Sequence, residues 1–360
     1  MKLFPASAAE QLEFDKVKAL LAAYCETEYA TEKASTLRIH TRRDFIMKYL
    51  GQAQEYKLLL SSGQHFPNDY VLNLSRELKL LSIPGAVLSG EQFLQIRKLA
   101  ESMRQIFRWF DAERTAANPE LAAVVEHSYY EKSITEDIDA VLDEQGNVKD
   151  NASDALASIR SGLYRKRLEL RRVFERIIQK WSKAGYVADT SEAFLSGRRV
   201  VAVNAEYKRQ VKGILLGESD TRKTAYLEPE ETIELNNDVF ALENEESKEV
   251  YRILRELTSR LSVHAALLKD YHSILGEYDF IRARARLAVE MNGEFPQVNE
   301  RSVVRLIQAY HPLLLLYNRK AQKPTIPTNI ELDDTRRILL VSGPNAGGKT
   351  VTLKTAGLLQ

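Results

Sequence analysis

Four residues near the end of the sequence have the types and the spacing that suit phosphate chemistry. Gly343, Gly348, Lys349 and Thr350 fit the pattern G-x-x-x-x-G-K-[ST], in which backbone N–H groups surround a phosphate. Glycines let the backbone approach the phosphate without a Cβ clash. A lysine at this position reaches the β- and γ-phosphates of a nucleotide, and the hydroxyl after it binds Mg²⁺. An ordinary glycine-rich turn between a strand and a helix is the alternative interpretation.

The residues that flank this loop complete a candidate site for ATP or ADP with Mg²⁺. The apolar run 338–341 predicts a buried strand before the loop, and 351–359 continues as a helix without a breaker. Because a helix N-terminus favours anions, we expect the phosphates to lie there, with Lys349 as the catalytic lysine and Thr350 as the metal ligand. The predicted nucleotide-binding residues are Gly343, Pro344, Asn345, Ala346, Gly347, Gly348, Lys349, Thr350 and Val351.

Length and composition indicate more than one domain and no membrane span. A chain of 360 residues exceeds the usual size of a single core. Its net charge of +1 gives no overall attraction to nucleic acid, so any basic surface must be local. The N-terminal residues lack the apolar centre of a signal peptide, and no apolar run is long enough for a membrane helix. Cys25 is the only cysteine, which excludes an internal disulfide and suits a reducing cytoplasm.

The spacing of apolar residues predicts a mainly α fold with a small β insert. Heptad-like stripes predict two long helices that pair as an antiparallel coiled-coil arm, with a β-rich segment between them. Short helices precede the arm, and a turn around Gly146 separates the two regions. The predicted domains are a helical core (1–150 and 276–300), a lever helix (151–185), a β-rich clamp (186–234), a returning lever helix (235–275) and the incomplete start of a P-loop α/β ATPase domain (301–360).

The two predicted arm helices carry opposite charge. Residues 160–183 contain nine Lys or Arg and two Glu, whereas residues 228–249 contain nine acidic residues and one Lys. In an antiparallel arm these two stretches lie side by side, so we expect ion pairs that set the register more than the stability. Basic residues that face outward instead could contact phosphates.

The β-rich insert is the better candidate for nucleic-acid binding. Residues 196–226 hold seven cations and three acidic residues, with Tyr207 and Tyr226 among them. Such cations give salt-sensitive binding that is largely independent of sequence. A solvated loop surface is the alternative interpretation. The predicted DNA-binding residues are Arg198, Arg199, Lys208, Arg209, Lys212, Arg222 and Lys223.

Other site chemistries find little support in the sequence. The six histidines form no H-E-x-x-H motif, and one cysteine cannot supply a zinc pair. A G-x-S-x-G nucleophile elbow is also missing. His264 falls on the apolar stripe of the arm, which favours a packed histidine over a ligand or a catalyst.

Several stretches together resemble the MutS family of DNA mismatch-repair ATPases. The loop "GPNAGGKT" is similar to the Walker A loop of that family, and "HPLL" at 311–314 to its His-Pro signature. "AEYKRQVKGI…YLEPEETIELNN" and "LEFDKVKALLAAY" resemble the recombination-associated type two branch. Mismatch-reading members carry a Phe-x-Glu wedge, which this sequence lacks, and this departure also favours the type two branch.

The resemblance implies an ATP-driven DNA clamp, homodimeric when complete, that acts on branched or recombining DNA. It also implies that the 360 residues are an N-terminal fragment that ends just after Walker A, without the acidic Walker B strand that hydrolysis needs. We therefore expect no ATP turnover by this chain alone.

Two other functions share some of these sequence features. Chromosome ATPases of the SMC type also combine a P-loop with a coiled coil, but their P-loop precedes the coil. The second alternative is a non-enzymatic coiled-coil interaction module with a vestigial P-loop.

Overall fold

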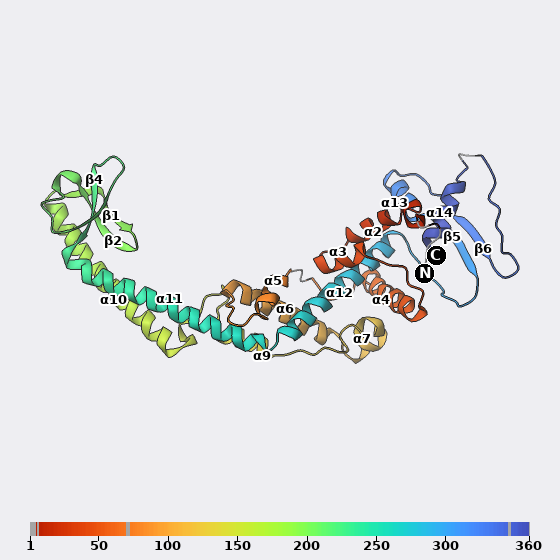
Figure 1. The fold of residues 1–360 in the computed structure, drawn as a ribbon, viewed down its shortest axis with the longest axis horizontal. Helices are drawn as coiled ribbons and strands as arrows, with labels where there is room; N and C mark the ends of the chain where they lie inside the picture. Colours follow the sequence, from red (N-terminus) through yellow and green to blue (C-terminus); the bar gives the residue numbers. More distant parts are fainter. Residues whose placement is uncertain (1–4, 6, 70–72, 345–346, 360) are drawn as a thin grey trace. The chain divides into compact units, whose positions relative to one another are not determined.

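The computed structural model describes residues 5, 7–69, 73–344 and 347–359, most of which are helical (Figure 1). The predicted mainly α fold with a small antiparallel sheet is confirmed. The described residues divide into two compact units. The first contains Met1–Leu78, Gln95–Lys132 and His264–Gln360, and the second contains Lys79–Leu94 and Ser133–Val263.

The first unit is helical and also holds a two-stranded sheet. Two of its helices, α5 (Ser75–Leu80) and α6 (Gly90–Trp109), have some residues in the second unit. Its other elements are α1 (Ala8–Gln11), α2 (Phe14–Ala22), α3 (Glu28–Ser35), α4 (Arg43–Ser61), α7 (Ala112–Ala117), α8 (Pro119–Ala122), α12 (Ala265–Glu290), β5 (Val304–Ala309), α13 (Pro312–Lys320), β6 (Thr328–Leu332) and α14 (Lys349–Leu359).

Helix α12 forms the centre of the first unit. Half of its residues are buried, Tyr271, Tyr278 and Phe280 among them. It packs against α2, α3 and α4. Gly276 allows the close approach of α3, because a Cβ there would lie 2.5 Å from the ring of Tyr29.

A buried aspartate of α12 caps the N-terminus of α3. The Oδ2 atom of Asp279 accepts hydrogen bonds from the backbone N–H groups of Glu26 (2.8 Å) and Thr27 (2.6 Å). Its Oδ1 atom accepts from Arg282 at 2.7 Å. Thr27 completes the cap, since its hydroxyl accepts from the N–H of Ala30 at 3.0 Å. The charge of the buried carboxylate is therefore paired and hydrogen-bonded.

The second unit contains two long helices with a four-stranded antiparallel sheet between them in the chain. The strand order is β1-β2-β4-β3. Its elements are α9 (Ser133–Val141), the 3₁₀ turns η1 (Asp150–Ala152), η2 (Ala205–Tyr207) and η3 (Glu230–Thr232), α10 (Asp154–Lys183), β1 (Val187–Leu195), β2 (Arg198–Asn204), β3 (Gly213–Glu218), β4 (Thr224–Pro229) and α11 (Ile233–Ser262).

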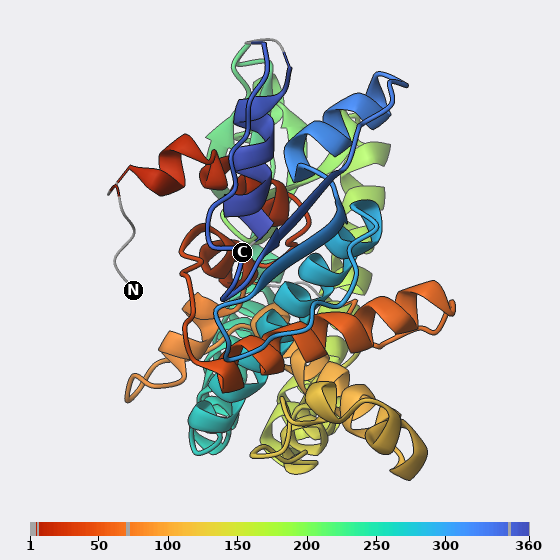
Figure 2. The same ribbon diagram turned by 90° about the vertical axis from the view of Figure 1, so that its right-hand side faces the viewer.

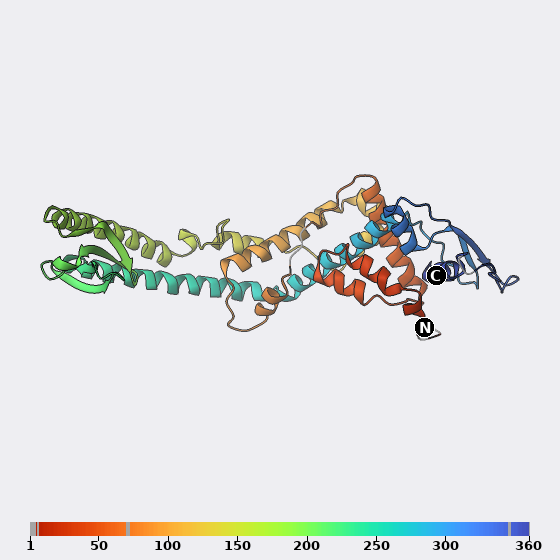
Figure 3. The ribbon, with the colours of Figure 1, turned by 90° about the horizontal axis from the view of Figure 1, so that it is seen from above.

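Helices α10 and α11 lie side by side with opposite directions (Figures 1 and 3). Ion pairs join Arg160 to Glu246 at 2.7 Å and Lys166 to Asp238 at 2.9 Å, so the partner number falls as the α10 number rises. An apolar cluster that includes Leu163 and Leu170 of α10 and Val239 of α11 packs between the two helices. The opposite charges predicted for the two helices therefore do pair across them.

One face of the sheet packs on the last turns of α10. Val201 and Val203 of β2 and Leu227 of β4 are buried against Phe174 and Trp181. β2 lies between β1 and β4, with Val201 opposite Leu227. The β-branched residues of β2 suit this central, buried position.

The turn predicted around Gly146 is present, and a second glycine explains its packing. Leu142 and Val148 form a β-bridge, and Gly146 has a φ of +85°. The carbonyl of Gly146 lies so close to Gly90, at the start of α6, that a Cβ on Gly90 would be 1.8 Å from it. Ser89 caps α6, because its hydroxyl accepts from the N–H of Gln92 at 3.3 Å.

The structure corrects the prediction of one continuous returning helix over residues 235–275. Helix α11 ends at Ser262 and α12 begins at Ala265, with His264 half-buried between them. The apolar stripe continues across the break, which is why the sequence pattern did not reveal it. The local sequence has neither Gly nor Pro there, and the structure offers no local reason for the interruption.

The C-terminal residues form small elements of the first unit (Figure 2). β5 and β6 pair antiparallel, with Leu306 opposite Ile330. The "HPLL" stretch begins α13, where Nδ1 of His311 accepts from the N–H of Leu314 at 3.4 Å. Pro312 at the first helical position suits this start.

Candidate nucleotide and nucleic-acid sites

The glycine-rich loop leads directly into α14, as predicted. Gly343 and Gly348 have φ values of +145° and +84°, which side chains with a Cβ rarely adopt. The N–H of Gly347 donates to the carbonyl of Pro344 at 2.9 Å. The predicted site residues Asn345 and Ala346 lie outside the described residues.

Lys349 bends back over the loop that precedes it. Its ammonium donates a hydrogen bond to the carbonyl of Gly343 at 2.6 Å. Thr350 and Val351 are exposed in the first turn of α14. A lysine and a hydroxyl at a helix N-terminus are the groups that bind phosphate and Mg²⁺ in loops of this kind.

The buried strand predicted before the loop is wrong. Residues 338–341 form neither helix nor strand, and Ile338 and Leu340 are 90% and 86% exposed. A strand needs a neighbour for its backbone N–H and C=O groups. The only strands of the first unit that the structure describes, β5 and β6, pair with each other and not with this run.

Helix α14 is held against the N-terminal residues of the first unit. Lys354 lies 2.7 Å from the carboxylate of Glu13, and a Cβ on Gly357 would lie 2.7 Å from the side chain of Leu12. Hydrogen bonds from Lys16 and Lys354 lower the pKa of Glu13 to about 2. Burial, together with the charge of Lys354, lowers the pKa of the nearby His311.

Two of the seven predicted DNA-binding residues are held within the fold. Arg198 donates to the buried carboxylate of Glu228 at 2.6 Å and to Asn237 at 2.5 Å. Arg199 pairs with Glu192 at 2.7 Å, and its side chain is only 15% exposed. These two arginines therefore stabilise the sheet and its junction with α11, and they offer little to a phosphate.

The other five predicted cations are more accessible. Lys208 pairs with Glu218 at 2.6 Å, and this hydrogen bond lowers the pKa of the Glu218 carboxyl. Four more side chains are exposed and form no hydrogen bond or ion pair with any residue that the structure describes. These four, which we call the tip cations, are Arg209, Lys212, Arg222 and Lys223.

Helix α10 carries a second set of exposed cations. Their helical spacing in the sequence could have distinguished them from the cations that form ion pairs. Of its nine Lys and Arg residues after 159, four form ion pairs: Arg160, Lys166, Arg167 and Arg171. The other five are exposed, and their spacings of 7, 4, 4 and 3 residues place them on one face of the helix. This α10 stripe consists of Arg165, Arg172, Arg176, Lys180 and Lys183.

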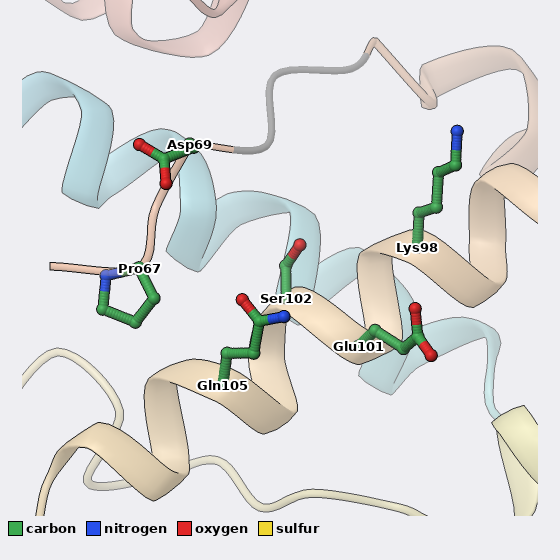
Figure 4. A pocket seen from close by; sticks show the side chains of 6 residues that line it. All are labelled: Pro67, Asp69, Lys98, Glu101, Ser102 and Gln105. Carbon is green, nitrogen blue, oxygen red and sulfur yellow. The ribbon is translucent and has the colours of Figure 1, made fainter.

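A shallow cavity of about 280 Å³ lies elsewhere in the first unit, between α6 and the residues before it (Figure 4). Lys98 and Glu101 lie on α6, and Asp69 lies across from that helix. The cavity therefore mixes both signs of charge and contains none of the predicted site residues. Within the described ranges, no group of three or more His, Cys, Asp or Glu side chains is arranged to hold a metal ion. None of the described helices is long and apolar enough to span a membrane.

Several known proteins with similar sequences carry the same name. The chain is 32% identical over 350 residues to a protein called Endonuclease MutS2 from Geobacillus sp. (strain WCH70), and the match covers 97% of this chain. It is 31% identical over 353 residues to a protein of the same name from Listeria welshimeri. The chain spans 44% of the length of each of these relatives. No family model matches the sequence. The similarity, which extends over nearly the whole chain, supports a MutS2-type family for this protein.

Proposed function

We propose that this chain provides ATP-dependent DNA binding in a MutS-family protein of DNA repair or recombination. The second unit, with α10 and α11 as levers and the sheet as a clamp, contacts DNA. The first unit carries the loop for ATP or ADP with Mg²⁺. The similarity to proteins named Endonuclease MutS2 over 97% of the chain is the observation that carries this proposal.

The unpaired cations of the second unit suit a DNA backbone. The tip cations and the α10 stripe together supply nine exposed Lys and Arg side chains that form no ion pair among the described residues. Each phosphate contact releases counterions and adds about 0.9 to the slope of log affinity against log salt. Because contacts between cations and phosphates carry no sequence information, the binding is largely independent of sequence.

Nucleotide binding is assigned to the loop and to the first turn of α14. Lys349 contacts the β- and γ-phosphates, Thr350 binds Mg²⁺, and the residues from Gly343 to Val351 surround the phosphates. Nucleotide regulates DNA affinity only if two states of the protein bind DNA differently. The proposed working form is a cytoplasmic homodimer.

We expect these 360 residues alone to hydrolyse no ATP, because the sequence after Lys349 contains no acidic strand to position Mg²⁺. A steady ATPase activity that disappears in Lys349→Ala would contradict this expectation.

Fluorescence anisotropy of a labelled DNA duplex over a series of salt concentrations tests the proposal. We expect binding that weakens steeply with salt and differs little between duplexes of unrelated sequence. A chain that fails to bind duplex or branched DNA at low salt would contradict the assignment.

The exposure of residues 338–341 favours one alternative, a helical interaction module whose loop binds no nucleotide. This alternative predicts that Mg-ATP leaves the thermal stability unchanged, whereas the proposed function predicts a higher melting temperature through ligand linkage.

A further inference from the structure

A cationic cavity in the first unit lies apart in sequence from the glycine-rich loop. It opens between α3, α4 and α12 and measures about 250 Å³. Its lining includes the basic side chains of Lys33, Arg38, His40 and Arg284 and the aromatic rings of Tyr49 and Phe280.

Arg284 lies against the aromatic rings of this lining. Its guanidinium lies over the rings of Tyr49 and Phe280, 5.0 and 4.8 Å from their centroids. It donates to the carbonyl of Tyr49 at 2.7 Å and to Oε1 of Gln52 at 3.1 Å. Both acceptors are neutral, and no carboxylate of the described residues lies within ion-pair distance of Arg284. Burial lowers the pKa of Arg284 to about 10.

A buried cation of this kind ordinarily has an anionic partner. A guanidinium has five N–H donors, and only two hydrogen bonds of Arg284 are present. Its Nε atom is buried and has no partner among the described residues. Arg284 thus brings an incompletely bonded guanidinium to the wall of the cavity that it lines.

Carboxylates balance the positive charges of the other basic groups at the cavity only in part. Lys33 pairs with Glu277, the acidic side chain that faces this cluster, and lies 5.3 Å from the centroid of the Phe280 ring. Arg38 is exposed and forms no ion pair among the described residues. The ring of His40 packs on Tyr49 at 5.5 Å between centroids. Basic groups from α3, from α12 and from the loop between α3 and α4 therefore line one small cavity.

We propose that this cavity binds a small phosphate-bearing anion. A phosphate offers several strong acceptor oxygens to the spare donors of Arg284 and to Arg38 and Lys33. A cavity of about 250 Å³ is smaller than the usual site for a drug-sized ligand, which suits a phosphate or diphosphate group. The planar guanidinium of Arg284 lies against two rings and is held by two hydrogen bonds, which orients it beside the cavity.

Calorimetric titration with inorganic pyrophosphate tests the site. All measurements use the full chain with Lys349→Ala, which removes the lysine of the glycine-rich loop. We expect binding by this chain, and a loss of affinity of roughly tenfold or more when Arg38→Glu is added. Arg284→Met should weaken binding further. Arg301→Glu, at an exposed arginine outside the cavity, is the matched control and should leave affinity unchanged.

Two results would overturn the proposal: no pyrophosphate binding by the Lys349→Ala chain, or equal affinity of the Arg38→Glu and Arg301→Glu chains. Arg38 is exposed, so its variant remains informative even if Arg284→Met fails to fold. Competition with a short single-stranded oligonucleotide then identifies the source of the phosphate. Displacement of pyrophosphate assigns the site to nucleic-acid phosphates, and no displacement assigns it to a free small phosphate compound.

Discussion

The ammonium of Lys354 lies 2.7 Å from the carboxylate of Glu13, across 341 residues of sequence. Lys354 belongs to α14, the helix that begins at the glycine-rich loop, and Glu13 precedes α2. Glu13 adopts a left-handed backbone conformation with φ of 60°, which is uncommon for a residue with a side chain. The ion pair therefore joins α14 to the N-terminal turn of the first unit.

This contact makes a prediction about the titration of Glu13. In Lys354→Met, the pKa of the Glu13 carboxyl should rise from about 2 toward the ordinary 4.5, and only part of the way because Lys16 remains bonded. Since the folded pKa is depressed, the stabilising contribution is complete above pH 4.5 and is lost as pH falls through about 2. An NMR titration of the Glu13 carboxyl carbon measures this pKa. An unchanged pKa in the variant would contradict the contact between Lys354 and Glu13.

The ion pairs between α10 and α11 should differ in strength according to burial. Arg160 is 26% exposed and also donates to the carbonyl of Val148 at 2.8 Å, so Arg160→Met should cost about 1–2 kcal/mol of unfolding free energy. Arg167 is 57% exposed and pairs with Glu243 alone, so Arg167→Met should cost only about 0–0.5 kcal/mol. Urea denaturation of both variants measures the difference. Equal losses of unfolding free energy in the two variants would show that burial does not determine how much these ion pairs stabilise the protein.

Arg198 should affect stability and leave DNA binding almost unchanged. Arg198→Met leaves the carboxylate of Glu228 buried with only Asn236 as a partner, at a cost of about 2 kcal/mol. Adding Glu228→Gln removes the unpaired charge and should restore part of that stability. Thermal unfolding and DNA anisotropy of the single and double variants measure both effects. A large loss of DNA affinity without a loss of stability would return Arg198 to the DNA-binding set.

The α10 stripe should contribute to DNA binding through charge alone. Reversal of Arg172 and Arg176 to Glu should lower the salt slope of DNA binding by about 2 while helix content stays the same. Circular dichroism and anisotropy in a salt series give the two values. A slope equal to that of the unchanged chain would place the stripe outside the DNA contact.

Periodicity carried most of the fold prediction. The stripe through Leu163 and Leu170 and the β-branched run of β2 place apolar residues at the period of each element, so α10 and the central strand follow from sequence. The end of α11 at Ser262 did not follow, because the apolar period continues through it. The strand expected at 338–341 also failed, since a strand depends on partners that local sequence does not specify.

The sequence predicted which types of residue form the candidate sites. It was less able to predict which individual cations remain free to bind a ligand. The loop glycines and Lys349 form a local motif, and the structure places the loop at the start of α14. The distinction between Arg198 and Lys212 depends on Glu228, which lies 30 residues from Arg198 in sequence and meets it through the pairing of β2 with β4. Long-range pairing of this kind is set by tertiary structure and leaves no local signal.

DNA binding by two matched double variants tests the central claim most directly. One variant reverses tip cations, Arg209→Glu with Lys212→Glu. The control reverses two exposed cations of α11 that form no ion pair with any described residue, Lys248→Glu with Arg255→Glu. Both variants change the net charge equally. A difference between their DNA affinities therefore depends on where the charges lie and not on the total charge. Our account predicts that the tip variant binds duplex DNA at least about tenfold more weakly and lowers the salt slope by about 2, while the control stays close to the unchanged chain. Equal affinities of the two variants would contradict the assignment of the β-sheet unit as the DNA clamp.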